Sequence, residues 1–78
     1  MEIEAGVAAV TSGRYHEGIE ILSEYAQSEF SAWWPIHYYI GVAYESIGKA
    51  EEAIAAFKKA LEFSPSNIEV MDELVAVY

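Results

Sequence analysis

The segment from His37 to Pro65 most constrains the fold, because its apolar residues recur at helical spacing on both sides of a glycine. Gly48 is suited to end a helix, since glycine adopts left-handed backbone without a Cβ clash, and Pro65 cannot continue one. The apolar positions are Ile36, Ile40, Ala43, Tyr44 and Ile47 before Gly48, and Ala50, Ala53, Ile54, Phe57, Ala60 and Leu61 after it. The segment therefore predicts two amphipathic helices folded back on each other.

The same pattern recurs on both sides of this segment, at a spacing close to the length of one helical hairpin. A shift of 35 residues lays Gly6 on Gly41, Gly13 on Gly48, Ile19 on Ile54 and Leu22 on Phe57. A shift of 34 residues lays Met71 on His37, Leu74 on Ile40 and Tyr78 on Tyr44. One hairpin of this size cannot bury its apolar faces alone, so we predict that the copies stack on one another.

The central copy resembles a tetratricopeptide repeat, a helix-turn-helix of about 34 residues with the pattern W-x2-L-G-x2-Y, then A-x3-F, then P. The matching positions are His37, Ile40, Gly41, Tyr44, Ala53, Phe57 and Pro65, with histidine in place of tryptophan and isoleucine in place of leucine. The resemblance implies an all-α fold, a right-handed superhelical stack of antiparallel helix-turn-helix repeats with about five helices. It implies a single domain, 1–78, with a degenerate first repeat at about 2–32, a second at about 34–67, and the first helix of a third at 68–78.

Two tryptophans, Trp33 and Trp34, stand between the first and second repeats, directly before Pro35. Proline is favoured at the first position of a helix, so we expect Pro35 to open the next helix and both tryptophans to lie in the connection. One ring would fill the space left where His37 replaces the tryptophan of the pattern, and the other would be half exposed over the first repeat. Alternatively, the exposed ring anchors a partner, because tryptophan is enriched at interface hot spots. The sequence does not decide which ring is buried.

The last helix is apolar on too many sides to close a repeat stack, whose terminal unit normally shows water a polar face. Either the chain belongs to a longer repeat array, or this surface pairs with another copy through Leu74, Val75 and Tyr78. The helix is expected to begin with a capping box, because Ser66 and Glu69 have the S-x-x-E spacing.

The charge of the chain excludes two classes of partner. Its 13 acidic and 4 basic residues give a net charge of −9, which repels nucleic acid and anionic membranes and attracts basic protein segments. Cysteine is absent, so neither disulfides nor thiolate zinc sites can form, and the first residues lack the pattern of a signal peptide. We expect a soluble, cytoplasmic protein that binds neither nucleic acid nor membranes.

Sequence signatures of enzymes are missing. The segment that begins at His16 lacks the second histidine of a zinc motif, and the chain has no glycine-rich phosphate loop. We expect no catalytic residues, no metal and no cofactor.

The resemblance implies that the first helices of successive repeats line a concave groove that binds a peptide or helix of another protein. The groove residues implied by position are Ile3, Val7, Val10, Tyr38, Val42, Glu45, Glu69 and Asp72. Some family members clamp acidic chaperone tails with lysine and asparagine, at positions held here by Tyr38, Val42 and Ser46. We therefore expect a partner with apolar anchors and some basic charge. The alternative is a structural self-assembly module, a homo-oligomer or part of a longer array.

Overall fold

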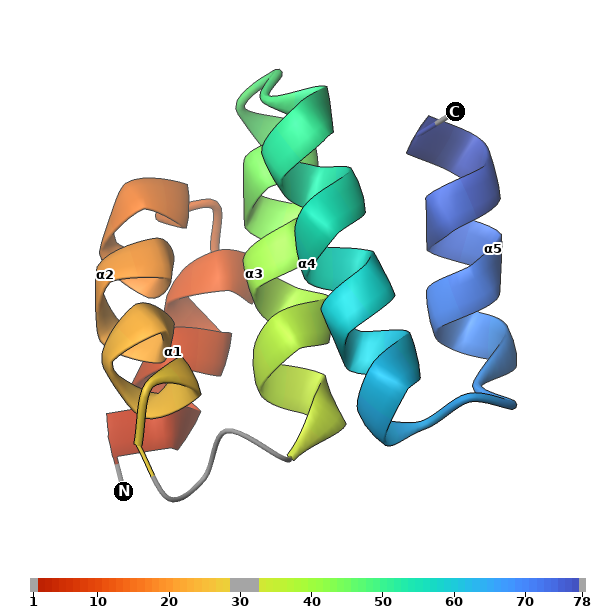
Figure 1. Ribbon diagram of the computed structural model, residues 1–78. Coiled ribbons are helices and arrows are strands. Elements are labelled where there is room, and N and C mark those ends of the chain that lie inside the picture. Colours follow the sequence, from red (N-terminus) through yellow and green to blue (C-terminus); the bar gives the residue numbers. More distant parts are fainter. Residues whose placement is uncertain (1, 29–32, 78) are drawn as a thin grey trace.

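The computed structural model describes residues 2–28 and 33–77, and these residues form helices joined by turns, without a β-strand. The five helices described are α1 (Glu2–Thr11), α2 (Tyr15–Ala26), α3 (Trp34–Ser46), α4 (Ala50–Phe63) and α5 (Ile68–Val77). The α1–α2 hairpin, the α3–α4 hairpin and α5 follow one another across Figure 1, with α1 behind α2 and α5 on the opposite side of the molecule from α1. The predicted all-helical repeat fold is confirmed.

Each helix packs against its neighbours along the chain, as in a stack of hairpins. α1 packs on α2 and α3 packs on α4, while α3 also contacts α1 and α2. α5 in turn contacts α4 and α3, and it contacts neither α1 nor α2. This arrangement is open at both ends and differs from a closed bundle, in which the first and last helices would meet.

The two hairpin turns have the same geometry, which the repeated sequence predicts. Gly13 and Gly48 have φ angles of 88° and 84°, in the left-handed region. The N–H of Arg14 donates to the carbonyl of Ala9 at 2.8 Å, and the N–H of Lys49 donates to that of Tyr44 at 2.9 Å. These hydrogen bonds, six residues to one, define a Schellman motif at each turn. The chain therefore reverses direction by the same device in both hairpins.

Two hydrophobic clusters hold the helices together, and each draws on three successive helices. The first joins α1, α2 and α3 and contains Ile3, Val10, Leu22, Ile36, Ile40 and Ala43. The second joins α4 and α5, with side chains of α3 packed on it, and contains Ala53, Phe57, Ala60 and Val70. Val42 and Tyr44 of α3 pack against both clusters. Neighbouring hairpins therefore cover each other's apolar faces.

Three local predictions are corrected by the structure. α3 begins at Trp34, one residue earlier than expected, so only Trp33 lies in the connection. Ala50 is exposed, although it belongs to the apolar pattern, and it is the first residue of α4. The cap of α5 is Asn67, whose side-chain oxygen accepts a hydrogen bond from the N–H of Val70 at 3.2 Å.

Candidate partner-binding surface

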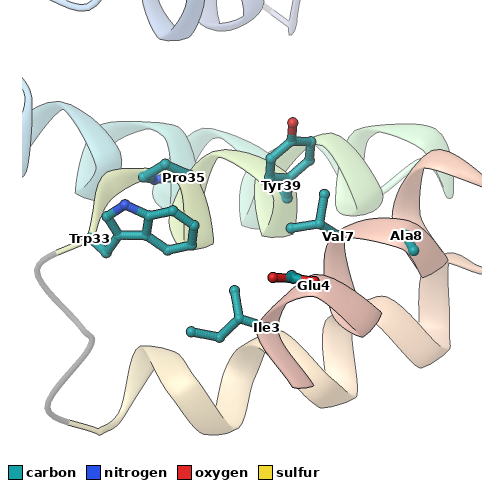
Figure 2. A pocket seen from close by; sticks show the side chains of 7 residues that line it. All are labelled: Ile3, Glu4, Val7, Ala8, Trp33, Pro35 and Tyr39. Atoms are coloured by element: carbon teal, nitrogen blue, oxygen red, sulfur yellow. The ribbon is translucent and has the colours of Figure 1, made fainter. Parts of the chain in front are cut away.

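An apolar hollow opens between α1 and the start of α3. Its volume is about 470 Å³. Six of the lining residues are apolar or aromatic and one is acidic: Ile3, Val7, Ala8, Trp33, Pro35, Tyr39 and Glu4. Figure 2 shows Trp33 and Ile3 on opposite sides of the hollow, with Val7 and Tyr39 beside them. The first helices of two neighbouring repeats thus share one recess.

The two tryptophans have different environments. Trp33 keeps 48% of its surface exposed and lines the hollow. Trp34 is half-buried and packs edge-on against Tyr38, with ring centroids 5.8 Å apart. His37 is itself buried and stacks on Phe63, with ring centroids 5.5 Å apart. Of the two tryptophans, Trp33 is therefore the exposed one.

The groove residues predicted on α1 separate into two groups. Ile3 and Val7 line the hollow, although Ile3 is only 5% exposed and forms part of its floor. Val10 is 3% exposed and packs inside the α1–α2 hairpin beside Gly18. Its side chain therefore belongs to the core between α1 and α2, because the turn of the helix carries it away from the hollow.

Acidic residues gather where α3 meets α5. Burial raises the pKa of the Tyr38 hydroxyl, with further contributions from Glu73, Glu69, Tyr39 and Glu45. Burial also raises the pKa of Glu45, followed by a side-chain hydrogen bond and repulsion between its carboxyl group and that of Glu73. Carboxyl groups of both helices thus lie close to the tyrosine ring.

The other residues predicted to bind a partner or to self-associate lie on α3 and α5, except one that lies outside the described residues. Tyr38, Val42 and Glu45 are half-buried, and Glu69 and Asp72 are exposed. On α5, Leu74 is half-buried against the second hydrophobic cluster, whereas Val75 is 74% exposed. Tyr78, the third residue predicted to self-associate, lies outside the described residues.

Within residues 2–28 and 33–77 no group of three or more histidine, aspartate or glutamate side chains is placed to hold a metal ion. In the same part of the chain, none of the helices combines the length and the hydropathy that crossing a membrane requires.

Comparison with known protein families bears on the central hairpin. Residues 34–67 match the sequence model of the tetratricopeptide repeat, and this match spans α3 and α4 with the turn between them. Residues 34–67 are a tetratricopeptide repeat. A comparison with curated proteins finds no match. Tetratricopeptide repeats generally mediate contacts between proteins. The matched segment contributes Pro35 and Tyr39 to the hollow and Glu45 to the acidic cluster.

Sequence reasoning missed several residues of this surface. Glu4, Ala8, Pro35 and Tyr39 line the hollow, and Glu73 pairs with Glu45. One signal was available: the shift of 35 residues that relates the repeats lays Glu4 on Tyr39, so both occupy the same position of a first helix. The contribution of Ala8 could not be found this way, because its counterpart Ala43 is fully buried.

Proposed function

We propose that this tetratricopeptide-repeat chain is a non-catalytic interaction module that holds a segment of a partner protein along α1, α3 and α5. The observation that carries the proposal is the open apolar hollow between α1 and α3, whose volume is within the range of sites that bind side chains or small ligands. A recess shared by two repeats is a suitable receptor for one large apolar side chain of a partner.

The apolar contact in the hollow would be made mainly by Trp33, Ala8 and Val7. Trp33 and Ala8 are exposed and Val7 is half-buried, so all three have surface that a partner can cover. Burying apolar surface contributes about 25 cal/mol per Å² before the costs of association, and an aromatic ring supplies a large part of such an area. The hollow would therefore act as the anchor of the complex.

Acidic residues beside the apolar recess favour a partner with basic residues. Glu4 lies at the hollow, and Glu45 and Glu73 form the carboxyl pair where α3 meets α5. A lysine or arginine between these two carboxyl groups would relieve their repulsion and favour their ionised form. The affinity for such a partner would then rise as the pH rises through the raised pKa of Glu45.

Selection of peptides on the purified chain tests this proposal. A random peptide library displayed on phage is selected on the wild type, and the affinity of the enriched peptides is measured by fluorescence polarisation for the wild type and its variants. We expect enriched peptides to combine one large apolar residue with lysine or arginine. Ala8→Glu should weaken their binding at least about tenfold, because it places a charge in the hollow.

The matched control is Ala55→Glu, the same substitution at an exposed position of α4. It adds the same charge and should leave affinity unchanged. Ala8→Glu is preferred to Val42→Glu, because Val42 packs against both hydrophobic clusters and its replacement would also destabilise the fold. Equal binding to the wild type and to Ala8→Glu would show that the partner lies elsewhere.

Self-assembly through α5 is a second candidate, supported by the exposure of Val75 and Ile68. Sedimentation velocity over a range of protein concentrations tests it. A dimer that Val75→Glu abolishes would support self-assembly, and a monomer at all concentrations would remove it.

A further inference from the structure

An exposed apolar stripe runs along α5, and we call its three residues, Ile68, Met71 and Val75, the α5 stripe. Their side chains are exposed by 71%, 42% and 74%, respectively. They are spaced by three and four residues, so they lie along one side of the helix. The opposite side of α5 packs on the second hydrophobic cluster through Val70 and Val77. The α5 stripe is therefore a second apolar surface, separate from the hollow between α1 and α3.

The residues of α3 that correspond to the α5 stripe, 34 positions earlier in the chain, indicate what covers such a surface in this fold. A shift of 34 residues lays Met71 on His37 and Val75 on Gly41. In α3 both of these positions are covered by α4, because His37 stacks on Phe63 and Gly41 lies against the ring of Phe57. The α5 stripe thus corresponds to the side of α3 on which another helix lies.

Val75 changes the shape of this side. A Cβ atom added at Gly41 would lie 2.6 Å from Cε1 of Phe57, and one added at Gly6 of α1 would lie 2.7 Å from Cγ of Leu22. Both glycines therefore make room for a large side chain of the covering helix. Val75 fills that room with its own side chain. A helix that covers the α5 stripe at the same separation must present a small residue opposite Val75.

Charge limits the occupant further. Asp72 is exposed on α5 and follows Met71 directly in the chain, whereas Glu69 interacts with the Tyr38 hydroxyl of α3. A second copy of this chain would bring the same Asp72 carboxylate and another net charge of −9 to the interface. A basic helix would instead place positive charge against Asp72.

We propose that the α5 stripe binds an amphipathic helix of another protein, with basic residues flanking its apolar side and an alanine or glycine opposite Val75. The α5 stripe lies apart from the hollow between α1 and α3, so one chain can contact two partner segments. Val75 sets the specificity, because its side chain excludes a helix that carries at this position a residue as large as Leu22 of α2 or Phe57 of α4.

Three fluorescent, lactam-bridged helical peptides with the same apolar side test this proposal by fluorescence polarisation. One has lysine flanks and a central alanine, one has glutamate flanks and a central alanine, and one has lysine flanks and a central phenylalanine. We expect the first peptide to bind the whole chain at least about tenfold more tightly than the other two. Val75→Gly should reverse the preference between alanine and phenylalanine, because it restores the space that Gly41 provides in α3.

Two further variants locate the site. Val75→Glu should weaken binding of the lysine and alanine peptide at least about tenfold, whereas Ala8→Glu in the hollow should leave it unchanged. The proposal is overturned if that peptide does not bind, if Val75→Glu has no effect on it, or if glutamate flanks serve as well as lysine. Sedimentation showing a dimer that Val75→Glu dissociates would also overturn it, since the occupant would then be a second copy.

Discussion

α3 and α5 occupy the same place in successive repeats, yet one is covered by a following helix and the other has an exposed side. Ile36 of α3 and its counterpart Val70 of α5 are both fully buried, so the two helices dock on the preceding helices in the same way. On the other side, His37 is 6% exposed, whereas its counterpart Met71 is 42% exposed. Docking on the preceding repeat and being covered by a following helix are therefore separate properties of a first helix.

The two helices also differ at one position on this side. Gly41 lets the ring of Phe57 approach the backbone of α3, and Val75 stands at the equivalent place in α5. Close packing of two helices depends on such small residues, because a side chain there fixes the smallest separation between the helix axes.

The largest expected effect is at the covered side of α3. Phe57→Ala should lower the free energy of unfolding by about 3–5 kcal/mol, because the ring is fully buried against α3. Val75→Ala on α5 should change it by less than about 0.5 kcal/mol, since that side chain is largely exposed. Urea denaturation followed by circular dichroism measures both. Similar losses for the two variants would contradict the contrast between the helices.

The next effect comes from making α3 resemble α5. Gly41→Val should cost about 1–3 kcal/mol, because the new side chain overlaps Phe57. Much of this cost should disappear when Gly41→Val is combined with Phe57→Ala, which vacates the space. A double-mutant cycle of urea denaturation measures the coupling. Additive effects would mean that the glycine has another role.

A smaller effect is expected at the start of α5, which has a side-chain cap, whereas α3 has none. Asn67→Ala should destabilise the protein by about 1 kcal/mol, because it leaves the N–H of Val70 without its partner. Ser66→Ala should have little effect, although the sequence pattern predicted this serine as the cap. Urea denaturation of the two variants decides between the two capping residues.

The contact between α3 and α5 predicts that the effect of Glu45→Gln on stability depends on pH. Burial and then the interaction with Glu73 raise the pKa of Glu45 above its ordinary value of 4.5, so the folded state holds the proton more tightly than the unfolded state. Stability from this group is present below pH 4.5 and is lost as the pH rises through the folded-state pKa. Glu45→Gln should therefore raise the urea midpoint at pH 7 relative to the wild type.

The same comparison at pH 4 is the control for Glu45→Gln. There the wild-type carboxyl is largely protonated and the advantage of glutamine should vanish. A gain of equal size at both pH values would show that the charge is not its cause.

The sequence predicted the parts of the fold that follow from spacing. Helical periodicity and the 35-residue shift indicated the hairpins, and Gly13 and Gly48 marked the turns that the structure contains. These features are local, since each depends on residues within a few turns of one helix. The family match at residues 34–67 confirms the central repeat that the spacing predicted.

The candidate site was predicted less completely, because it depends on how helices pack. Val10 follows Val7 at the three-residue spacing of one helix face, yet its side chain packs against Gly18 of α2. Of these two valines, Val7 alone lines the hollow. Trp33 lines the hollow because of the path of the connection before α3, which no periodicity specifies. The carboxyl pair of Glu45 and Glu73 likewise arises from the contact between two repeats.

The most direct test of the proposed binding surface is a nuclear magnetic resonance titration of the labelled chain with a peptide selected on it. We expect the largest shifts of backbone amide signals to fall on Val7, Ala8 and Tyr39, which line the hollow. Shifts concentrated on the exposed residues Glu17, Glu20 and Glu24 of α2, with the hollow unchanged, would contradict it.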